Sequence, residues 1–356
     1  MLRLLLLTVI GVVSLAGPAL AMDSIAVSPD HKGFVLVPSG KTFHPWGHNY
    51  ASNDGLDDPA KNPWEKIDAD LAAMREMHAN LIRIHLRFAK FMDGPDKPNE
   101  AALKRLSELL THAEQHGIYV DITGLACYGK DARAAWYDAL PDKERWAVQA
   151  RFWEAVAKSC ADSPAVFCYD LVNEPVVFGT RKDGWYTGNY GGYEFLQRLS
   201  LDQASRPPNE VAAEWAHTLT TAIRKQDKSH LITIGMLPIF AVAPKAVEKD
   251  LDFISVHIYP SAGKVDDAIA NLRQFAIGKP LVVEETFPLS CSVEEERDFL
   301  LKSRGIATGW VGHYLDKSEA DLKAEKAAGK LTIGEAINLG WDETFRAIGP
   351  EMLGKK

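Results

Sequence analysis

Apolar residues follow two different periods along this chain, one typical of helices and the other of buried strands. In residues 64–78, Ile67, Leu71 and Met74 recur every three to four positions, which predicts a helix with one apolar face. Further helices are predicted at 100–116, 143–160, 209–226, 266–276, 293–303 and 335–348. Short apolar runs typical of buried parallel strands lie between them, at 80–86, 118–123, 166–173, 230–235, 253–259, 281–285 and 306–311.

Strand and helix therefore alternate about eight times, which predicts a parallel sheet with right-handed crossovers. The length fits a closed (β/α)₈ barrel of the TIM type better than an open doubly wound sheet, and no Gly-x-Gly-x-x-Gly follows a strand. Strand-like residues on both sides of Pro38-Ser39-Gly40-Lys41 predict a β-hairpin ahead of the barrel. No Ser/Gly/Pro linker divides residues 22–356, so we expect one domain.

The first 21 residues differ from the rest of the chain. Arg3 precedes an apolar run that ends in Ala19-Leu20-Ala21, the pattern of a signal peptide cut after Ala21. An uncleaved membrane anchor is the alternative, which Gly17-Pro18 disfavours. We therefore expect a secreted or periplasmic protein, with no membrane contact after cleavage. The formal net charge of −8 argues against nucleic acid as a partner, and we expect a monomer.

Four cysteines, Cys127, Cys160, Cys168 and Cys291, leave disulfides possible in an exported protein, with three connectivities for full pairing. Cys168 lies inside an apolar strand and is expected to be a free core residue. The spacing of the cysteines does not match a zinc site. We expect neither a metal nor another cofactor.

The run at 166–173 ends in Asn173-Glu174-Pro175, and the proline prevents further ladder hydrogen bonding. A carboxylate at the carboxyl end of a barrel strand lies where such barrels carry their chemistry. Glu174 taken alone fits a solvated strand end as well as a catalytic group. A second acidic strand end, Glu284-Glu285, favours catalysis.

Other polar or aromatic residues follow the same strand ends, and the full set is His48, Asn49, Arg83, His85, Asn173, Glu174, His257, Tyr259, Glu285, Trp310 and His313. Each of them alone is compatible with simple solvation of a strand end. Two carboxylates across one pocket are what cleavage of a glycosidic bond needs, one protonated to donate to the leaving oxygen and one ionised. A nearby cation separates their proton affinities.

Three motifs resemble glycoside hydrolase family 5: Asn173-Glu174-Pro175, His257-Ile258-Tyr259, and Lys279-Pro280 followed by Leu281-Val282-Val283-Glu284-Glu285. The resemblance extends over nearly all of the chain after residue 21. It implies a retaining β-glycosidase of clan A on a (β/α)₈ barrel. It also implies that Glu174 is the general acid/base and Glu285 the nucleophile.

The resemblance implies roles for further residues. Asn173 would hydrogen-bond the 2-hydroxyl of the sugar, Arg83 and Tyr259 would contact the nucleophile, and His257 would line the same subsite. His48 and Asn49 match a less specific pattern at the first strand, where either residue can instead support packing. Because side chains alternate along a strand, only one of Glu284 and Glu285 is expected to face the pocket, and Glu284 is the fallback nucleophile.

Two strand ends depart from the family pattern. Thr123 stands where many relatives carry a histidine, and His313 stands where a sugar-stacking tryptophan is common. Trp310 is a candidate for sugar contact or a core aromatic. The long aromatic loop at 176–208 suggests additional sugar contacts, for which Trp185 and Tyr186 are the best candidates.

The leading hypothesis is a secreted retaining glycosidase that acts on a poly- or oligosaccharide of the β-mannan or β-glucan type. The alternative is a catalytically silent carbohydrate-binding barrel, which the altered strand ends at Thr123 and His313 support. A barrel lyase or aldolase would need a lysine or a metal cluster at the strand ends, and the sequence suggests neither.

Overall fold

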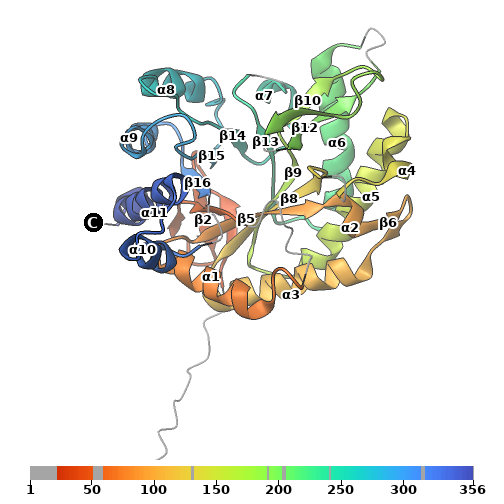
Figure 1. Cartoon of the computed structure of the whole chain (residues 1–356). Helices are drawn as coiled ribbons and strands as arrows, with labels where there is room; N and C mark the ends of the chain where they lie inside the picture. Colours follow the sequence, from red (N-terminus) through yellow and green to blue (C-terminus); the bar gives the residue numbers. More distant parts are fainter. Residues whose placement is uncertain are drawn as a thin grey trace, which may run out of the picture.

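Eight parallel strands close into a barrel in the computed structural model, which describes residues 22–50, 59–129, 132–190, 192–202, 206–239, 242–313 and 317–355. Around the barrel the strands are β4 (Trp46–Asn49), β5 (Leu81–Arg87), β8 (Tyr119–Ala126), β9 (Val166–Asn173), β13 (Leu231–Met236), β14 (Ile254–His257), β15 (Leu281–Glu285) and β16 (Gly309–His313). Figure 1 shows them enclosed by helices. The predicted (β/α)₈ barrel is confirmed.

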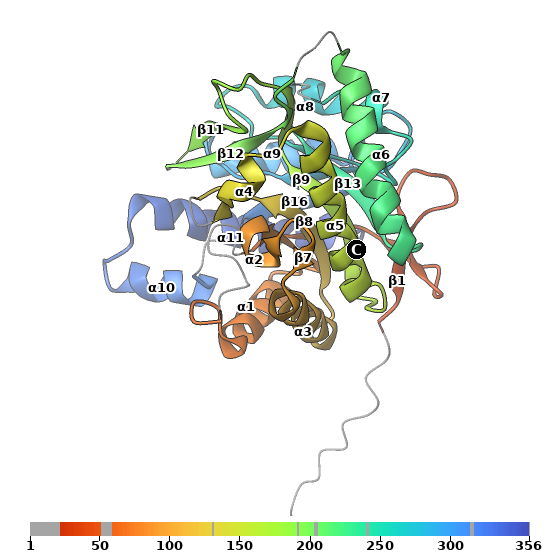
Figure 2. The same ribbon diagram turned by 90° about the vertical axis from the view of Figure 1, so that its right-hand side faces the viewer.

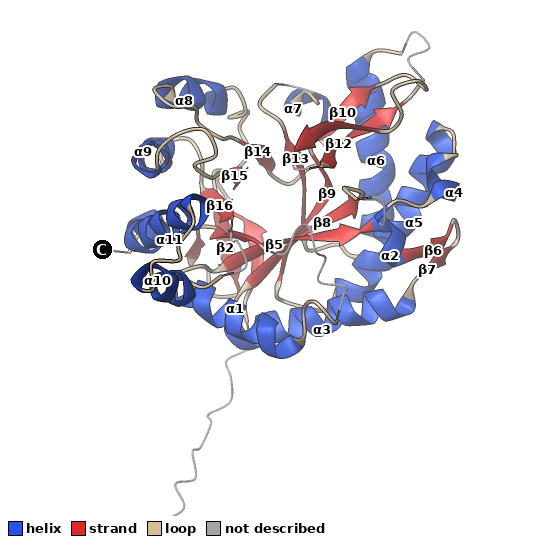
Figure 3. Ribbon diagram, viewed as in Figure 1, coloured by secondary structure: helices blue, strands red, loops and turns tan. Residues whose placement is uncertain are grey.

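The predicted helices lie on the outside of the strands, as Figure 3 shows. They are α1 (Trp64–Glu76), α3 (Glu100–His116), α5 (Asp142–Cys160), α6 (Pro208–Gln226), α8 (Val265–Arg273), α9 (Val293–Ser303) and α11 (Ile333–Met352). The signals that fix α3 are local: the Asn99 side chain accepts from the Ala102 backbone N–H, and Gly117 ends the helix with φ 63°. Leu103, Leu106 and Leu110 form its buried face.

Shorter elements join these. They are α2 (Phe88–Phe91), β6 (Met92–Gly94), β7 (Lys97–Pro98), α4 (Ala135–Asp138), α7 (Pro244–Val247) and α10 (Glu319–Ala327). None of the helices within the described ranges is long and apolar enough to cross a membrane. The predicted signal peptide, residues 1–21, lies outside the described residues.

The predicted N-terminal hairpin is present and belongs to a three-stranded antiparallel sheet, formed by β1 (Ser24–Val27), β2 (Phe34–Val37) and β3 (Thr42–Phe43). Phe34 on β2 is fully buried, and its ring meets Phe167 and Phe253 edge-on at centroid distances of 5.2 and 5.3 Å. Because Phe167 and Phe253 stand at the starts of their strands, this sheet closes the amino-terminal end of the barrel. Any chemistry must therefore take place at the carboxyl end.

Residues 176–208, expected to be a loop, contain a second small sheet in the order β10 (Pro175–Phe178), β12 (Tyr193–Ser200), β11 (Tyr186–Tyr190). Figures 1 and 2 both place this sheet at the edge of the barrel near α6. Gly188 and Gly192 have φ of 75° and 89°, values that glycine adopts most readily. The glycines that suggested a loop are thus part of a strand and a turn.

All four cysteines are free thiols. Cys127, Cys160 and Cys168 are buried, while Cys291 is half-buried. The disulfides left open by the sequence are therefore not formed, and the predicted burial of Cys168 in the core is confirmed.

Candidate active site

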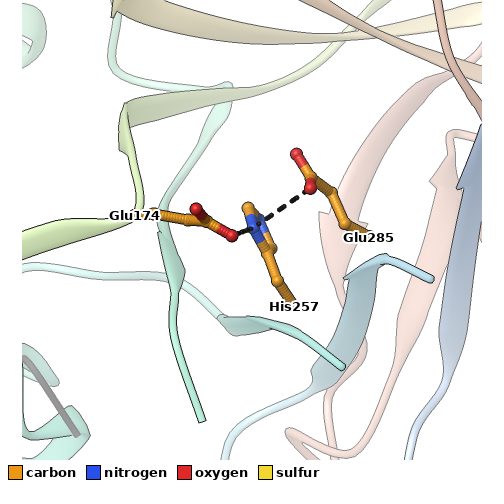
Figure 4. Close-up of side chains that lie close together, drawn as sticks. All are labelled: Glu174, His257 and Glu285. Carbon is orange, nitrogen blue, oxygen red and sulfur yellow. Dashed lines mark hydrogen bonds and ion pairs between the residues drawn. The ribbon is translucent and has the colours of Figure 1, made fainter. Parts of the chain in front are cut away.

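Glu174, His257 and Glu285 come from the carboxyl ends of three strands and meet at the centre of the barrel. In Figure 4 the imidazole of His257 lies between the two carboxylates. Its Nδ1 is 2.8 Å from Oε1 of Glu174 and 3.5 Å from Oε2 of Glu285. One oxygen of each carboxylate and one ring nitrogen all lie within 4.8 Å of one another. The two carboxyl groups therefore lie close together, as they do in retaining glycosidases, where roughly 5 Å separates them.

The backbone at Glu174 is in an uncommon conformation. Its φ is 48°, in the left-handed region that residues other than glycine rarely adopt. The backbone N–H of Glu174 donates to the Gly235 carbonyl at 2.8 Å, and Pro175 starts the next strand in a new direction. The chain thus turns at Glu174 and directs its carboxyl group toward His257. Such local strain is common where a side chain must be held for chemistry.

Glu285 is held in its ionised form by donors on both oxygens. Arg83 Nη1 donates to Oε1 at 2.5 Å, and the Tyr259 hydroxyl donates to Oε2 at 2.6 Å. Burial alone would raise the pKa of Glu285, but the positive charges of His257 and Arg83 outweigh burial and hold the pKa well below its usual range. A buried but ionised carboxylate is suited to act as a nucleophile.

Glu174 has the opposite preference. Burial raises the pKa of Glu174 above its usual value, and the hydrogen bond from His257 offsets this only in part. For His257, burial would lower the pKa, but Glu285, Glu174 and Glu284 together raise it to about 10. In this site Glu174 thus favours its protonated form and Glu285 its ionised form, on either side of an imidazole that favours its charged form.

Arg83, fully buried on β5, connects several of the predicted residues. Besides Glu285, its guanidinium donates to Asn49 Oδ1 at 2.8 Å, Asn173 Oδ1 at 3.0 Å and Asp170 Oδ2 at 2.7 Å. The Asn49 amide donates in turn to the carbonyls of Glu284 and Gly312. Asn49 and Asn173 are thus held by Arg83.

Glu284 and Glu285 both point into the barrel, so the expectation from strict alternation was wrong. Val256 pairs with Val283, whereas the next residue, His257, pairs with Glu285, so Glu284 is an extra residue in a β-bulge. Glu284 has no exposed surface, while Glu285 keeps 8%. Glu285 is therefore the better placed of the two to reach a substrate.

His313 also lies at this site. Its Nε2 is 2.8 Å from the Tyr259 hydroxyl and 3.9 Å from Oε2 of Glu285, and its side chain retains 23% exposure. It lies close enough to the carboxylates to contact a sugar bound between them.

His48 and Trp310, both expected as candidates for substrate binding, are packing residues. His48 has no exposed surface, its ring lies 4.2 Å from that of Phe345 on α11, and burial lowers the pKa of His48 to about 3. Trp310 is 3% exposed, packs edge-on against Trp46 and donates from Nε1 to the Ser303 hydroxyl. Both side chains lie between the barrel and its outer helices, because the strands alternate and Asn49 takes the inward position beside His48.

Trp185 and Tyr186, predicted to contact a sugar, are mostly buried and are held by contacts within the protein. They are 5% and 7% exposed. The Trp185 Nε1 donates to the Asp138 carbonyl, the Tyr186 hydroxyl donates to the Asp138 carboxylate, and both rings lie beside the Arg145 guanidinium. These aromatic residues attach the small sheet to α4 and α5.

Three polar residues at the centre, Tyr128, Asp121 and Asp170, were not singled out from the sequence. Tyr128 accepts a hydrogen bond from His85 Nδ1 at 2.8 Å, and the Thr123 hydroxyl donates to Asp170 at 2.8 Å. Asp121 and Asp170 are fully buried. Charged residues within apolar strands are the signal that could have identified them, since such residues are rarely buried without a partner.

Among the residues that the structure describes, two groups of side chains have the spacing of metal ligands: Glu174, His257 and Glu285 in one, and Asp121, Asp170 and Glu284 in the other. Cations of the protein already occupy these positions. Arg83 contacts Glu285, Asp170 and Glu284, and His257 lies between the carboxylates of the first group. We therefore assign neither group to a metal.

Comparison with known proteins places this site in a family. The model of the cellulase family, glycosyl hydrolase family 5, matches residues 41–274. The chain belongs to glycosyl hydrolase family 5. The match includes Arg83, Glu174 and His257 and ends before Glu285.

Two curated relatives of this family 5 chain are named mannan endo-1,4-beta-mannosidase A. The protein from Podospora anserina is 29% identical over 219 residues, which are 51% of this chain and 50% of that protein. The protein from Emericella nidulans is 25% identical over 266 residues, 64% of this chain and 61% of that protein. The chain thus spans between half and two thirds of the length of these curated relatives.

Solved structures show the same fold. An exo-beta-1,4-mannosidase from Opitutaceae bacterium strain TAV5 superposes with a TM-score of 0.66 at 15% identity, over 92% of this chain and 63% of that chain. A beta-1,4-mannanase from Aplysia kurodai superposes with a TM-score of 0.62 at 14% identity, over 93% and 98% of the two chains. The barrel of this family 5 chain therefore has the same fold as these solved structures.

Proposed function

We propose that this protein is a retaining β-glycosidase that cleaves β-1,4-linked mannan or manno-oligosaccharides. The observation that carries the proposal is the pairing of Glu174 and Glu285 around His257, within 4.8 Å of one another and with opposite protonation preferences. The mannan endo-1,4-beta-mannosidases among its relatives support mannan as the substrate. The predicted signal peptide supports export, so that the enzyme would act on glycans outside the cytoplasm.

The reaction follows from the geometry in two steps. Glu174 donates its proton to the leaving glycosidic oxygen while the Glu285 carboxylate bonds to the anomeric carbon, which forms a glycosyl ester. Water, deprotonated by Glu174, then attacks the same carbon and releases Glu285. The two inversions together retain the anomeric configuration. His257 stays beside whichever carboxylate is ionised, because its Nδ1 lies within 3.5 Å of both.

The substrate is tested by incubating the protein with β-1,4-mannan, manno-oligosaccharides, a β-1,4-glucan and an aryl β-mannoside, followed by sizing of the products. Mannan cleavage with first-formed products of the β configuration, seen by proton NMR, is the expected result. Cleavage of glucan alone would show that the substrate is a glucan and not a mannan. First-formed products of the α configuration would exclude a retaining mechanism. Oligosaccharide binding by calorimetry without any product would instead indicate a catalytically silent binding barrel.

The residue roles are tested by azide rescue with an activated aryl β-mannoside. Glu285→Ala should lose turnover and, with azide, yield the α-mannosyl azide, because azide enters where the nucleophile was. Glu174→Ala should lose about 10²–10⁴-fold on mannan and yield the β-mannosyl azide. Rescue of Glu284→Ala by azide, without rescue of Glu285→Ala, would show that Glu284 is the nucleophile.

A further inference from the structure

A second group of carboxyl groups lies beneath Glu174 and Glu285, on the inner wall of the barrel. Asp121 on β8, Asp170 on β9 and Glu284 on β15 have no exposed surface, and one oxygen of each lies within 4.8 Å of the others. Arg83 contacts Asp170 at 2.7 Å and Glu284 at 3.8 Å. Both Asp121 oxygens and Glu284 Oε1 find no hydrogen-bond donor among the described residues. Three buried acids thus lie together, and the guanidinium of Arg83 contacts two of them.

Retention of a proton by one of the three acids would lower the cost of burying them together. An ionised carboxylate without a donor is costly in a buried position, so one acid of the group should keep its proton. Burial and the neighbouring charge of Glu284 raise the pKa of Asp121 well above its usual range. For Glu284, burial would raise the pKa, but Arg83 and His257 lower it. Asp121 is thus the acid of this pair that favours its protonated form, and its proton can be donated to the neighbouring carboxylate of Glu284.

The other oxygen of Glu284 faces the active site. Oε2 accepts from the Ser255 hydroxyl at 2.8 Å and lies 3.4 Å from Nε2 of His257. The opposite ring nitrogen, Nδ1, lies 2.8 Å from Glu174. Each nitrogen of His257 thus faces a carboxyl oxygen, an arrangement in which both nitrogens act as donors only when the ring is an imidazolium.

We propose that Glu284, supported by protonated Asp121, is a positioning residue that keeps His257 doubly protonated and so holds the Glu174 carboxyl in place for proton transfer. This inference rests on the proposed glycosidase function. When Glu174 gives up its proton and Glu285 becomes an ester, the negative charge moves from Glu285 to Glu174. An imidazolium within 3.5 Å of both can balance the charge in either state without moving.

The other charged groups around the ring are consistent with this role. His257 faces Glu174 from β9, Glu284 and Glu285 from β15, Arg83 and His85 from β5, and His313 from β16. Burial and the charge of Arg83 lower the pKa of His85 well below its usual range, and burial lowers that of His313. The shifts in pKa thus favour the neutral form of these two rings and the charged form of His257.

The test measures the His257 ring directly and needs no substrate. In ¹⁵N-labelled protein, both ring nitrogens of His257 should give imidazolium signals between about pH 5 and 8, where a free histidine loses its proton. Glu284→Gln removes the charge but keeps the shape, so the ring should titrate at least about one pH unit lower. In the same variant the pH profile of kcat/KM should change. Asp121→Asn still donates to Glu284 and should leave the ring signals as they are.

Asp342→Asn, at a buried carboxyl on α11 whose charged neighbours are Glu319 and Glu343, is the matched control and should not alter the ring signals. A neutral His257 ring in the unaltered protein at pH 6 would overturn the proposal, even where Glu284→Gln fails to fold. So would an unchanged ring titration in folded Glu284→Gln, or a stoichiometric metal found in the purified protein by elemental analysis. Normal turnover in Glu174→Ala would instead overturn the proposed function and leave the ring measurement valid.

Discussion

Arg83 donates to Oε1 of Glu285 at 2.5 Å, although the two residues lie 202 positions apart in the chain. Arg83 has no exposed surface, and burial would lower its pKa, but the surrounding carboxylates raise it well above the usual value. The ion pair therefore fixes both the charge and the position of Glu285.

Tyr259→Phe removes the second donor to Glu285, whose Oε2 accepts from the Tyr259 hydroxyl at 2.6 Å. A hydrogen bond to a charged group contributes about 1.5–3 kcal/mol, so kcat should fall by roughly tenfold to a hundredfold. The acidic limb of the pH profile should move to higher pH, because Glu285 then gains a proton more easily. Steady-state kinetics across pH measure both effects. Tyr119→Phe, which loses a hydrogen bond to the Asp23 carbonyl at the opposite end of the barrel, is the control and should keep full activity.

The pH profile of kcat/KM should be bell-shaped. Activity requires ionised Glu285, whose pKa is lowered, so it is lost as the pH falls through a value below the ordinary glutamate pKa near 4.3. Activity also requires protonated Glu174, whose pKa is raised, so it is lost as the pH rises through a value above about 4.3. An acidic limb well above pH 5 in the unaltered protein would contradict this assignment.

Gly235→Ala should disrupt the site although it replaces none of the charged residues. A Cβ at this position would lie 2.7 Å from His257 Nε2, 2.8 Å from Glu284 Oε2 and 3.1 Å from Arg83 Nη2. These partners are buried and mutually bonded, so accommodation should cost about 1–3 kcal/mol of stability as well as activity. Thermal unfolding and kinetics measure the two effects. Gly305→Ala places its Cβ in open space and should change neither.

Asp342→Asn should stabilise the protein at high pH. Burial raises the pKa of Asp342 to about 7, with further contributions from Glu319 and Glu343. A raised carboxyl pKa means that folding favours the protonated form, so stability is present at low pH and is lost progressively as the pH rises from about 4 to about 7. The variant should therefore match the parent near pH 4 and exceed it by about 2 to 4 kcal/mol at pH 8. Denaturant unfolding at the two pH values measures the difference, and an equal gain at both would disprove the pKa as its cause.

Much of the fold could be predicted from the sequence because its signals are local. The apolar spacing and caps of 100–116 identify α3, and the short apolar runs identify the barrel strands. The sheet in 176–208 was missed because its glycines resemble those of a loop, and its strands pair with each other rather than with the barrel. The bulge at Glu284 was missed because a bulge depends on the partner strand, here β14.

The sequence by itself determined the barrel class and placed Glu174, His257, Tyr259 and Glu285 at strand ends, because periodicity and strand termination are encoded over a few neighbouring residues. Only the tertiary structure decided which side each residue faces. It turned Asn49 inward and His48 outward against Phe345, and it buried Trp185 and Tyr186 against Arg145. Such orientations depend on packing and register between strands distant in the chain, which no local pattern records.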